Sequence, residues 1–224
     1  MDITEVRDQP LSSLFTSFYR CDACDVVDRD GGRVQKGHPC SRCGSPSTTG
    51  AGLHFGISVF ALIDLMQEAY HRVRPASEAG WSYAWHDSEK DHQLGVVIYY
   101  TTLGEVLLDQ LFTNKIRQLG LPKSVAGRLL SDHQTMLARV DKLFPALMAA
   151  KWRETIRIIS QRTGLDFQDP VTFYLKARRA RNLFLHEGNK WAVSSDMPGA
   201  CLKNIQPLLT LFMELHNQFC LHAA

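Results

Sequence analysis

The chain has 224 residues, of which 45% are hydrophobic and 21% are charged. This size supports one core with a small appendage, and 25 Lys plus Arg against 23 Asp plus Glu exclude a strongly basic protein that coats nucleic acid. The longest apolar runs, such as Leu94 to Leu108, are too short and too polar for a membrane span. The first residues, MDITEVRDQP, lack the apolar segment of a secretory signal, so we expect a cytoplasmic protein.

Four of the six cysteines lie near the N-terminus with the spacing C-x2-C-x15-C-x2-C: Cys21, Cys24, Cys40 and Cys43. This spacing is typical of a zinc ribbon, in which each C-x2-C pair forms a tight knuckle around one ion. Four thiolates leave no open position for water, so we expect Zn²⁺ with a structural role rather than a catalytic one. Two disulfides are the competing interpretation, and the lack of an export signal argues against them.

The segment between the two knuckles, residues 25–39, is rich in Gly and Asp and predicts a short hairpin around Gly31-Gly32. Its basic residues are offset by acidic neighbours, so three roles stay open for the ribbon. It could bind nucleic acid, contact a partner protein or brace the rest of the chain. We place a zinc-ribbon region with its lead-in at residues 1–50 and a helical domain at residues 51–224.

From about His54 onward, apolar residues recur at three- and four-residue spacing, which predicts amphipathic helices. The first helix ends before Arg74-Pro75, and the aromatic stretch Trp81–Trp85 is interpreted as a loop on the core. A long, mostly buried helix from about Ser88 to Leu119 follows, stopped by Gly120. Further helices are expected at about 123–131, 133–150, 151–163, 169–186 and 198–221. The predicted fold class is therefore all-α, a helical bundle with a small N-terminal zinc ribbon.

The most informative stretch is Arg178 to Gly188, RRARNLFLHEG, at the end of the helix expected from Asp169. Asp169 is the expected N-cap, and Gly188 is placed to end the helix. At about 100° per residue, one arc forms the core face, and a second set of residues lies opposite it. The core face comprises Phe173, Ala177, Ala180 and Phe184, and the opposite side carries Arg178, Arg179, Asn182 and His186.

Arg181 keeps its charge at any accessible pH, while His186 can exchange a proton near neutral pH. Cleavage of a phosphodiester by an internal 2′-hydroxyl needs both, because one group moves protons and the other stabilises charge on the phosphate. The two residues are five positions apart, hence about 140° around one helix. Two copies of the helix meeting across a two-fold axis would bring them together, so we expect a homodimer. Three leucines lie off the core face and suit burial in such a dimer interface: Leu175, Leu183 and Leu185.

The hexapeptide Arg181-Asn182-Leu183-Phe184-Leu185-His186 resembles the R-x4-6-H motif of the HEPN superfamily, in its form with Asn directly after Arg. HEPN domains are compact helical bundles with this motif near the end of a late helix and an acidic residue on an apolar earlier helix. Residues 101–109 are similar to that earlier helix, with Glu105 as the acidic residue. The resemblance covers roughly residues 54–222 and leaves the ribbon outside it.

The resemblance implies a metal-independent endoribonuclease that cuts RNA at a site shared by two protomers. By carry-over, His186 is the general acid or base, Arg181 stabilises the transition state, Asn182 orients the histidine or the phosphate, and Glu105 is an acidic auxiliary. Arg178 and Arg179, the densest basic run, are the candidate substrate contacts. Many members are toxins or act in defence against phage, often held by an antitoxin or other regulatory protein.

Other HEPN proteins keep the fold without activity, so the alternative function is a dimeric scaffold for protein or nucleic acid. For Glu105 the catalytic and the purely structural interpretations stay equally open. For Asp109 we favour a structural role, such as pairing with an arginine. Cys201 and Cys220 are expected to be buried thiols. Four scattered histidines show no metal-ligand spacing and are assigned no role: His71, His92, His133 and His216.

Overall fold

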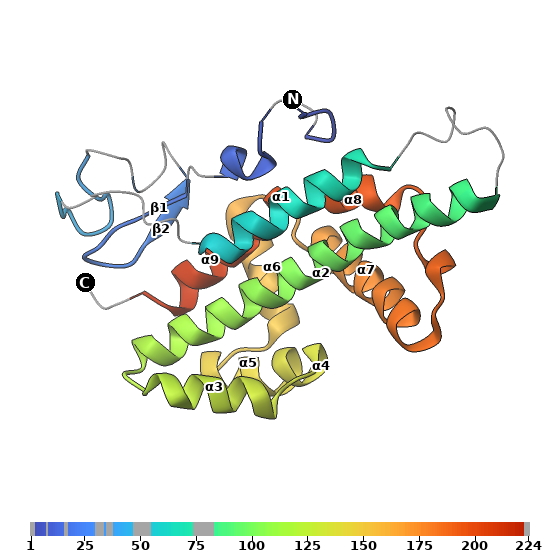
Figure 1. Ribbon diagram of the computed structural model, residues 1–224. Helices are drawn as coiled ribbons and strands as arrows, with labels where there is room; N and C mark the ends of the chain where they lie inside the picture. The colour runs from blue at the N-terminus through green and yellow to red at the C-terminus, as the bar shows by residue number, and fades with distance from the viewer. Residues whose placement is uncertain are drawn as a thin grey trace. The chain divides into compact units, whose positions relative to one another are not determined.

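The structure is a computed structural model that describes residues 3–7, 9–15, 18–29, 34, 38–46, 55–73 and 83–221. Within these residues a two-stranded sheet is accompanied by helices alone (Figure 1), which confirms the predicted helical fold class with a small cysteine-rich region. None of the described helices combines the length and apolar composition needed to cross a membrane. The predicted boundary at residue 50 lies outside the described residues, as does the hairpin expected at Gly31-Gly32.

The chain forms two compact units, and each is described by itself. The first contains Met1–Phe15, Ile57–Gly104 and Asp169–Leu208, and the second contains Thr16–Gly56, Glu105–Gln168 and Leu209–Ala224. The elements in chain order are η1 (Leu11–Phe15), β1 (Phe18–Arg20), β2 (Val27–Arg29), α1 (Ile57–His71), α2 (Tyr83–Gln118), α3 (Lys123–Asp132), α4 (Met136–Ala138), the π-helical turn η3 (Arg139–Leu143), α5 (Phe144–Met148), α6 (Trp152–Thr163), α7 (Gln168–Glu187), η4 (Lys190–Ala192), α8 (Met197–Lys203) and α9 (Ile205–Phe219).

The predicted start of the long helix and the predicted extent of the last helix are wrong. Helix α2 begins at Tyr83, so residues 83–85 are helical rather than a loop, and no Gly or Pro interrupts the sequence from there to Gly95. The single last helix expected at 198–221 is two helices, α8 and α9, separated at Asn204. Pro207 has no N–H and tolerates only the first turn of a helix, so the chain restarts at Ile205. The Asn204 side chain donates to the Ala200 carbonyl at 2.9 Å and closes the end of α8.

In the first unit, the N-terminal segment is fastened to α1 by two polar side chains. The buried amide of Gln67 accepts from Leu11 N at 2.7 Å and donates to the carbonyls of Val6 and Gln9 at 2.8 and 3.1 Å. The Asp64 carboxylate accepts from both the backbone and the hydroxyl of Ser12. These bonds satisfy the N–H groups at the start of η1, which have no partner within such a short helix.

The first unit also holds α7 against the N-terminal half of α2 at one close approach. The ring of Tyr174 lies over Gly104, and its hydroxyl donates to the Thr101 carbonyl at 3.2 Å. A Cβ atom at Gly104 would lie 2.2 Å from the Cε2 atom of Tyr174, so only glycine fits there. The fully buried ring of Tyr100 packs on Phe173 and Tyr174, with centroid distances of 5.7 and 6.0 Å.

Gly104→Ala should therefore destabilise the first unit, although alanine is the better helix former. Overpacking of this kind costs about 1–3 kcal/mol. Gly95→Ala on the same helix is the matched control, because its Cβ would meet Ala69 at an ordinary 3.6 Å. That control should stabilise by about 0.5–1 kcal/mol. Urea unfolding of the two variants measures the difference, and a Gly104→Ala protein as stable as the control would contradict the close packing.

The core of the second unit is built around the buried ring of Phe144. This ring lies 5.0 Å from Trp152 and 5.6 Å from Phe219, centroid to centroid and edge-on in both cases. The end of α9 is closed by α2, because Lys115 Nζ donates to the Phe219 carbonyl at 2.9 Å. A lysine at the last carbonyls of a helix satisfies acceptors that have no partner within the helix.

Candidate functional site

The four cysteines predicted to bind zinc come together in the second unit. Their sulfur atoms all lie within 4.8 Å of one another. The Sγ–Sγ distances are 3.7 Å for Cys21–Cys43 and 3.8 Å for Cys24–Cys40. A tetrahedron with Zn–S bonds of about 2.3 Å has edges of about 3.8 Å, so the cluster fits a zinc ion. All six cysteines are free, which excludes the two disulfides considered from the sequence.

The two C-x2-C pairs form knuckles with the same backbone pattern. Asp25 N donates to the Cys21 carbonyl, and Gly44 N donates to the Cys40 carbonyl, at 2.9 and 2.8 Å. The residue after each second cysteine is left-handed, with φ of 59° at Asp25 and 69° at Gly44. Glycine adopts this conformation without strain, and Asp tolerates it better than most residues. The repeated geometry turns both pairs of sulfur atoms toward one point.

Burial and backbone hydrogen bonds act on the thiols in opposite directions. Burial raises the pKa of Cys21 and of Cys24 above the ordinary thiol value. At Cys40 burial also acts to raise the pKa, but backbone bonds from Cys43 and Arg42, with those from neighbouring thiols, lower it to about 7. A cation that binds here therefore displaces protons, as expected for a thiolate metal site.

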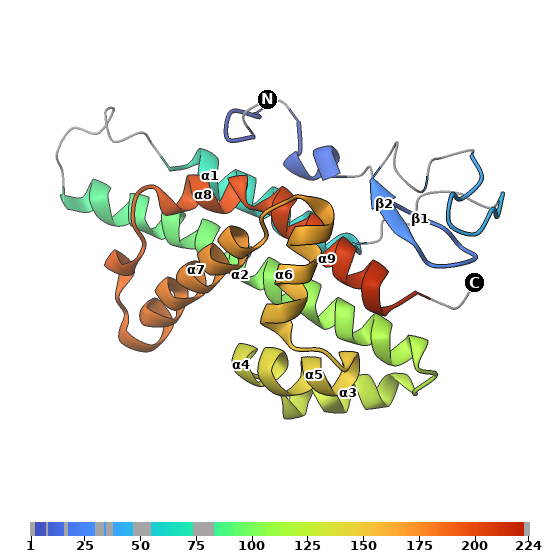
Figure 2. The same ribbon diagram turned by 180° about the vertical axis from the view of Figure 1, so that it is seen from behind.

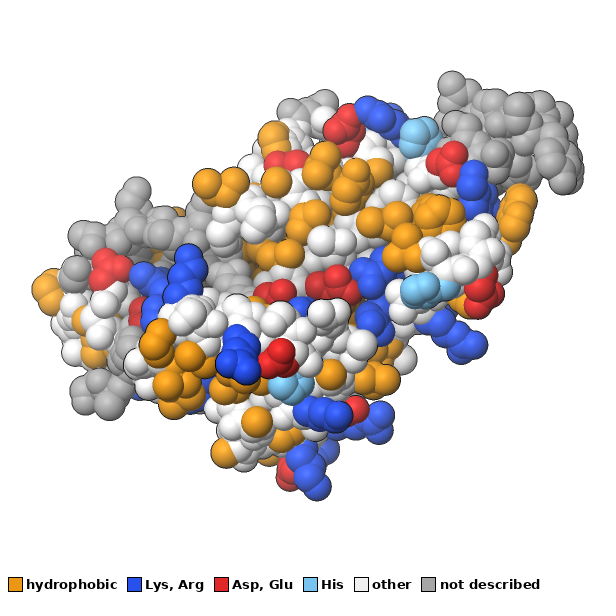
Figure 3. Space-filling view, turned by 60° about the horizontal axis from the view of Figure 1, so that its bottom comes forward, with side chains coloured by type: hydrophobic (Ala, Val, Ile, Leu, Met, Phe, Trp, Pro, Cys, Tyr) orange, Lys and Arg blue, Asp and Glu red, His pale blue; other side chains and the backbone are white. Residues whose placement is uncertain are grey.

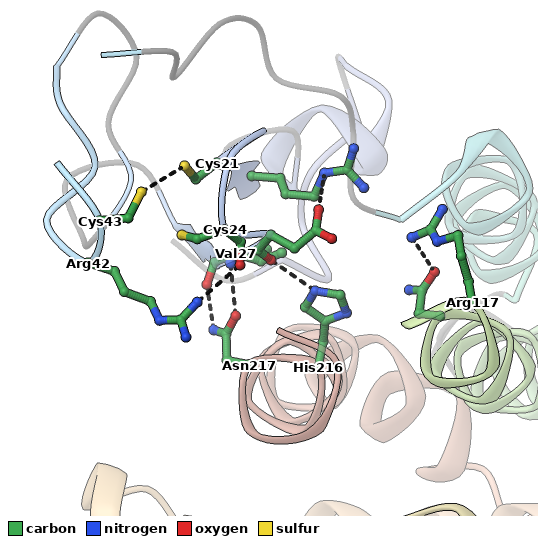
Figure 4. A network of polar contacts seen from close by, with 11 residues as sticks. Cys21, Cys24, Val27, Arg42, Cys43, Arg117, His216 and Asn217 are labelled. Carbon is green, nitrogen blue, oxygen red and sulfur yellow. Dashed lines mark hydrogen bonds and ion pairs between the residues drawn. The ribbon is translucent and has the colours of Figure 1, made fainter. Parts of the chain in front are cut away.

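The ribbon is joined to α9 by two polar side chains of that helix (Figure 4). Asn217 Oδ1 accepts from Val27 N at 2.8 Å, and Asn217 Nδ2 donates to the Val27 carbonyl. His216 Nε2 lies 3.0 Å from the Asp25 carbonyl, directly after the first knuckle. Both side chains are buried, and β1 pairs antiparallel with β2 around the knuckle, with Arg20 opposite Val27. The cluster is thus built into the core of the second unit.

The second candidate site lies on α7, whose ends are fixed by local signals. The helix begins at Gln168, whose N–H donates to the Asp166 carboxylate at 2.7 Å, so the expected N-cap at Asp169 is wrong. Gly188 ends it as predicted, with φ of 66°. Gly188 N donates to the Phe184 carbonyl at 2.8 Å, which is the αL arrangement of a helix end, and Asn189 N donates to the Leu183 carbonyl at 3.3 Å.

The buried side of α7 agrees only in part with the predicted core face. Ala177 and Ala180 are buried as expected, whereas Phe173 and Phe184 are half-buried. The largest buried side chain is Tyr174, which the sequence reasoning missed. The available signal was Gly104, because a glycine inside a long helix often marks a close approach.

The guanidinium of Arg181 is directed toward α2 by neutral oxygen acceptors. Its Nε and Nη2 atoms each lie 3.4 Å from Asn182 Oδ1, and Nη1 lies 3.5 Å from Thr101 Oγ1. The Thr101 hydroxyl donates its proton to backbone carbonyls within α2, so its lone pairs accept from the arginine. Arg181 and Asn182 are both half-buried, so the geometry brings together Arg181, Asn182 and Thr101.

His186 and Arg179 are exposed, and Arg178 is half-buried. Leu175 and Leu185 are 49% and 58% exposed, while Leu183 is half-buried. On the face in Figure 3, Lys and Arg side chains are dispersed among acidic and apolar ones, with no single basic patch. On this face, contact with a polyanion would therefore depend on a few local cations.

Glu105 and Asp109 belong to the second unit. Asp109 Oδ1 lies 2.7 Å from Arg139 Nη1, which confirms the structural role favoured for Asp109. Burial raises the pKa of Asp109, Arg139 lowers it, and Glu105 adds to the rise. The catalytic role of Glu105 stays a prediction.

Comparison of the chain with known proteins identifies no relative. No protein-family model, no curated protein and no solved structure matches it.

Proposed function

We propose that the protein is a metal-independent endoribonuclease of the HEPN type, with Arg181, Asn182 and His186 of α7 as its catalytic group. The observation that carries this proposal is the arrangement of the motif on α7. Its arginine is half-buried and held by Asn182 and Thr101, while its histidine is exposed in the last turn. A fixed cation beside an accessible proton-transfer group is what the reaction needs.

In the proposed reaction, His186 takes the proton of a ribose 2′-hydroxyl, whose oxygen then attacks the adjacent phosphorus. Arg181 stabilises the charge that builds up on the phosphate oxygens. The P–O5′ bond breaks, and the leaving oxygen takes a proton from the imidazolium of the second protomer or from water. The products are a 2′,3′-cyclic phosphate and a 5′-hydroxyl, and no step uses the cysteine-bound ion.

The composite site remains part of the proposal. On one helix, Arg181 and His186 are about 140° apart, so two protomers would supply the groups around one phosphate. The exposed Leu175 and Leu185 are apolar residues that such an interface could bury. Light scattering at micromolar concentration tests this part, and a monomer that cleaves RNA would contradict it.

The experiment is incubation of the wild-type protein with a labelled single-stranded RNA and with tRNA, without divalent cations. We expect cleavage, with products that carry 2′,3′-cyclic phosphates and open to monophosphates in acid. A toxin should also slow the growth of cells that express it, and an antitoxin or regulator should relieve that effect.

A non-catalytic scaffold is the second candidate. The observation that favours it is the set of hydrogen bonds from Asn217 and His216 of α9 to Val27 and Asp25, which join the cysteine-rich module to the second unit. Dimerisation together with intact RNA in every assay would support the scaffold and overturn the nuclease.

A further inference from the structure

One large aromatic side chain of the first unit is exposed just beyond the α7 motif. Trp191 is 65% exposed, which is unusual for a tryptophan. It follows His186 by five residues, so their Cα atoms lie at most about 18 Å apart. In Figures 1 and 2 the chain turns back at the end of α7 and then passes through η4, which carries Trp191.

The turn that carries Trp191 is held in place by specific contacts. The Asn189 side chain accepts from Trp191 N at 3.1 Å and caps η4. Lys190 Nζ lies 2.8 Å from Asp91 Oδ1 of α2. The exposed ring therefore belongs to a turn that is held by a cap and by an ion pair with α2.

A cation lies over the ring. Lys90 Nζ is 5.4 Å from the Trp191 ring centroid, within cation–π range. The same ammonium donates to the Val193 carbonyl at 2.8 Å and to Gln93 Oε1 at 2.9 Å, so Lys90 is fixed to α2 and to the turn at once. Burial lowers the pKa of Lys90.

We propose that Trp191 is a stacking platform for an unpaired base of single-stranded RNA bound at the α7 motif. This inference rests on the proposed function and assigns it a substrate class. Exposed aromatic rings beside Lys or Arg are the feature with which proteins hold single strands, because every base has a face that stacks. A paired base is already stacked within its duplex and is not available to Trp191.

The pattern of charge favours RNA over a protein partner. Lys90 lies over the ring, and Arg178 and Arg179 lie on the preceding helix near His186. A nucleotide offers one base for the ring and one phosphate for the cations, whereas the core of a protein interface is depleted in lysine. An exposed ring and an exposed leucine such as Leu185 would also suit an interface with a second copy of the chain. The test below distinguishes a second copy from RNA.

The test uses the His186→Ala protein, which we expect to bind RNA without cutting it, and a fluorescein-labelled single-stranded RNA of mixed sequence. In this background Trp191→Ala should weaken binding about 5- to 150-fold, as expected for the loss of 1–3 kcal/mol of stacking. Trp191→Phe should restore most of the affinity. Ile57→Ala, which removes an 85% exposed apolar side chain from the same unit, should leave binding unchanged.

A set of RNAs with one abasic position each provides the second measurement. At one position the loss of the base should weaken binding to the protein with Trp191 and leave the Trp191→Ala protein unaffected. A duplex of the same sequence should bind both proteins alike. Equal binding by the Trp and Ala proteins, no binding of any single strand, or a Trp191→Ala protein that only loses its dimer would each overturn the proposal.

Cleavage is assayed separately, in proteins that keep His186. The stacking role of Trp191 and the nuclease activity can therefore fail independently. If RNA binding depends on Trp191 but the protein never cuts RNA, the stacking proposal is supported and the nuclease proposal is overturned. Cleavage that depends on His186 but not on Trp191 would do the reverse.

Discussion

His186→Ala is expected to abolish RNA cleavage while the protein stays folded. Loss of a general acid–base group typically costs about 10²–10⁴-fold in rate. The substitution should leave the fold intact because His186 is exposed and α7 ends through Gly188 and backbone bonds. Arg181→Ala should act in the same direction, with a loss of about 10²–10³-fold for one stabilising donor.

His71→Ala and Lys176→Ala are the matched controls for these substitutions. His71 is likewise an exposed histidine in the last turn of a helix of the first unit, and Lys176 is an exposed cation on α7 itself. Both should cleave at the wild-type rate. Initial rates on labelled RNA and circular dichroism of each variant decide the matter. If His186→Ala cuts as fast as the wild type, α7 is not the catalytic helix.

Removal of a zinc ion from the cysteine cluster should lower the stability of the second unit by several kcal/mol. Zinc binding contributes about 10–16 kcal/mol in isolated zinc-finger peptides, part of which the helical core can replace here. Without the knuckles, the buried side chains of His216 and Asn217 lose their backbone partners, at about 1–3 kcal/mol for each unsatisfied group. At about 2–4 °C per kcal/mol, the thermal midpoint should fall by about 10 °C or more.

Cys43→Ser should reproduce the effect of the chelator and reduce the zinc content. Cys220→Ala serves as its control, because Cys220 is a buried thiol of the same unit outside the cluster. That variant should keep about one zinc per chain and its sensitivity to EDTA. The zinc released on denaturation measures the metal content, and thermal unfolding measures the stability. An unchanged midpoint after complete removal of the metal would contradict the structural role.

The sequence predicted those features that depend on neighbouring residues. The C-x2-C knuckles, the end of α7 at Gly188 and most helices follow from local spacing, and the structure confirms them. The start of α7 shows the limit of such rules. Asp166 and Asp169 lie three positions apart, and aspartate is a preferred N-cap residue at either position. Only the bond from Gln168 N to Asp166 decides between them.

Features that join distant parts of the chain had no comparable signal. Asn217 and Val27 are 190 positions apart, and His216 and Asp25 are 191 positions apart. Neither contact follows from periodicity, and His216 was therefore assigned no role. The same holds for Thr101 and Arg181, which meet only because Tyr174 brings α7 against Gly104. Such contacts depend on packing, which amphipathic patterns define only as a face.

The two hydrogen bonds between the Asn217 side chain and the Val27 backbone also bear on contacts between the ribbon and other chains. An antiparallel neighbour would accept from the N–H and donate to the C=O of one residue, and the Asn217 carboxamide makes that same pair of bonds with Val27. The side chain thus takes the place of one residue of a third strand. Uncovered sheet edges are templates for aggregation and domain swapping. Asn217 therefore occupies the backbone N–H and C=O of Val27, which are the groups a foreign strand would pair with at this point of β2.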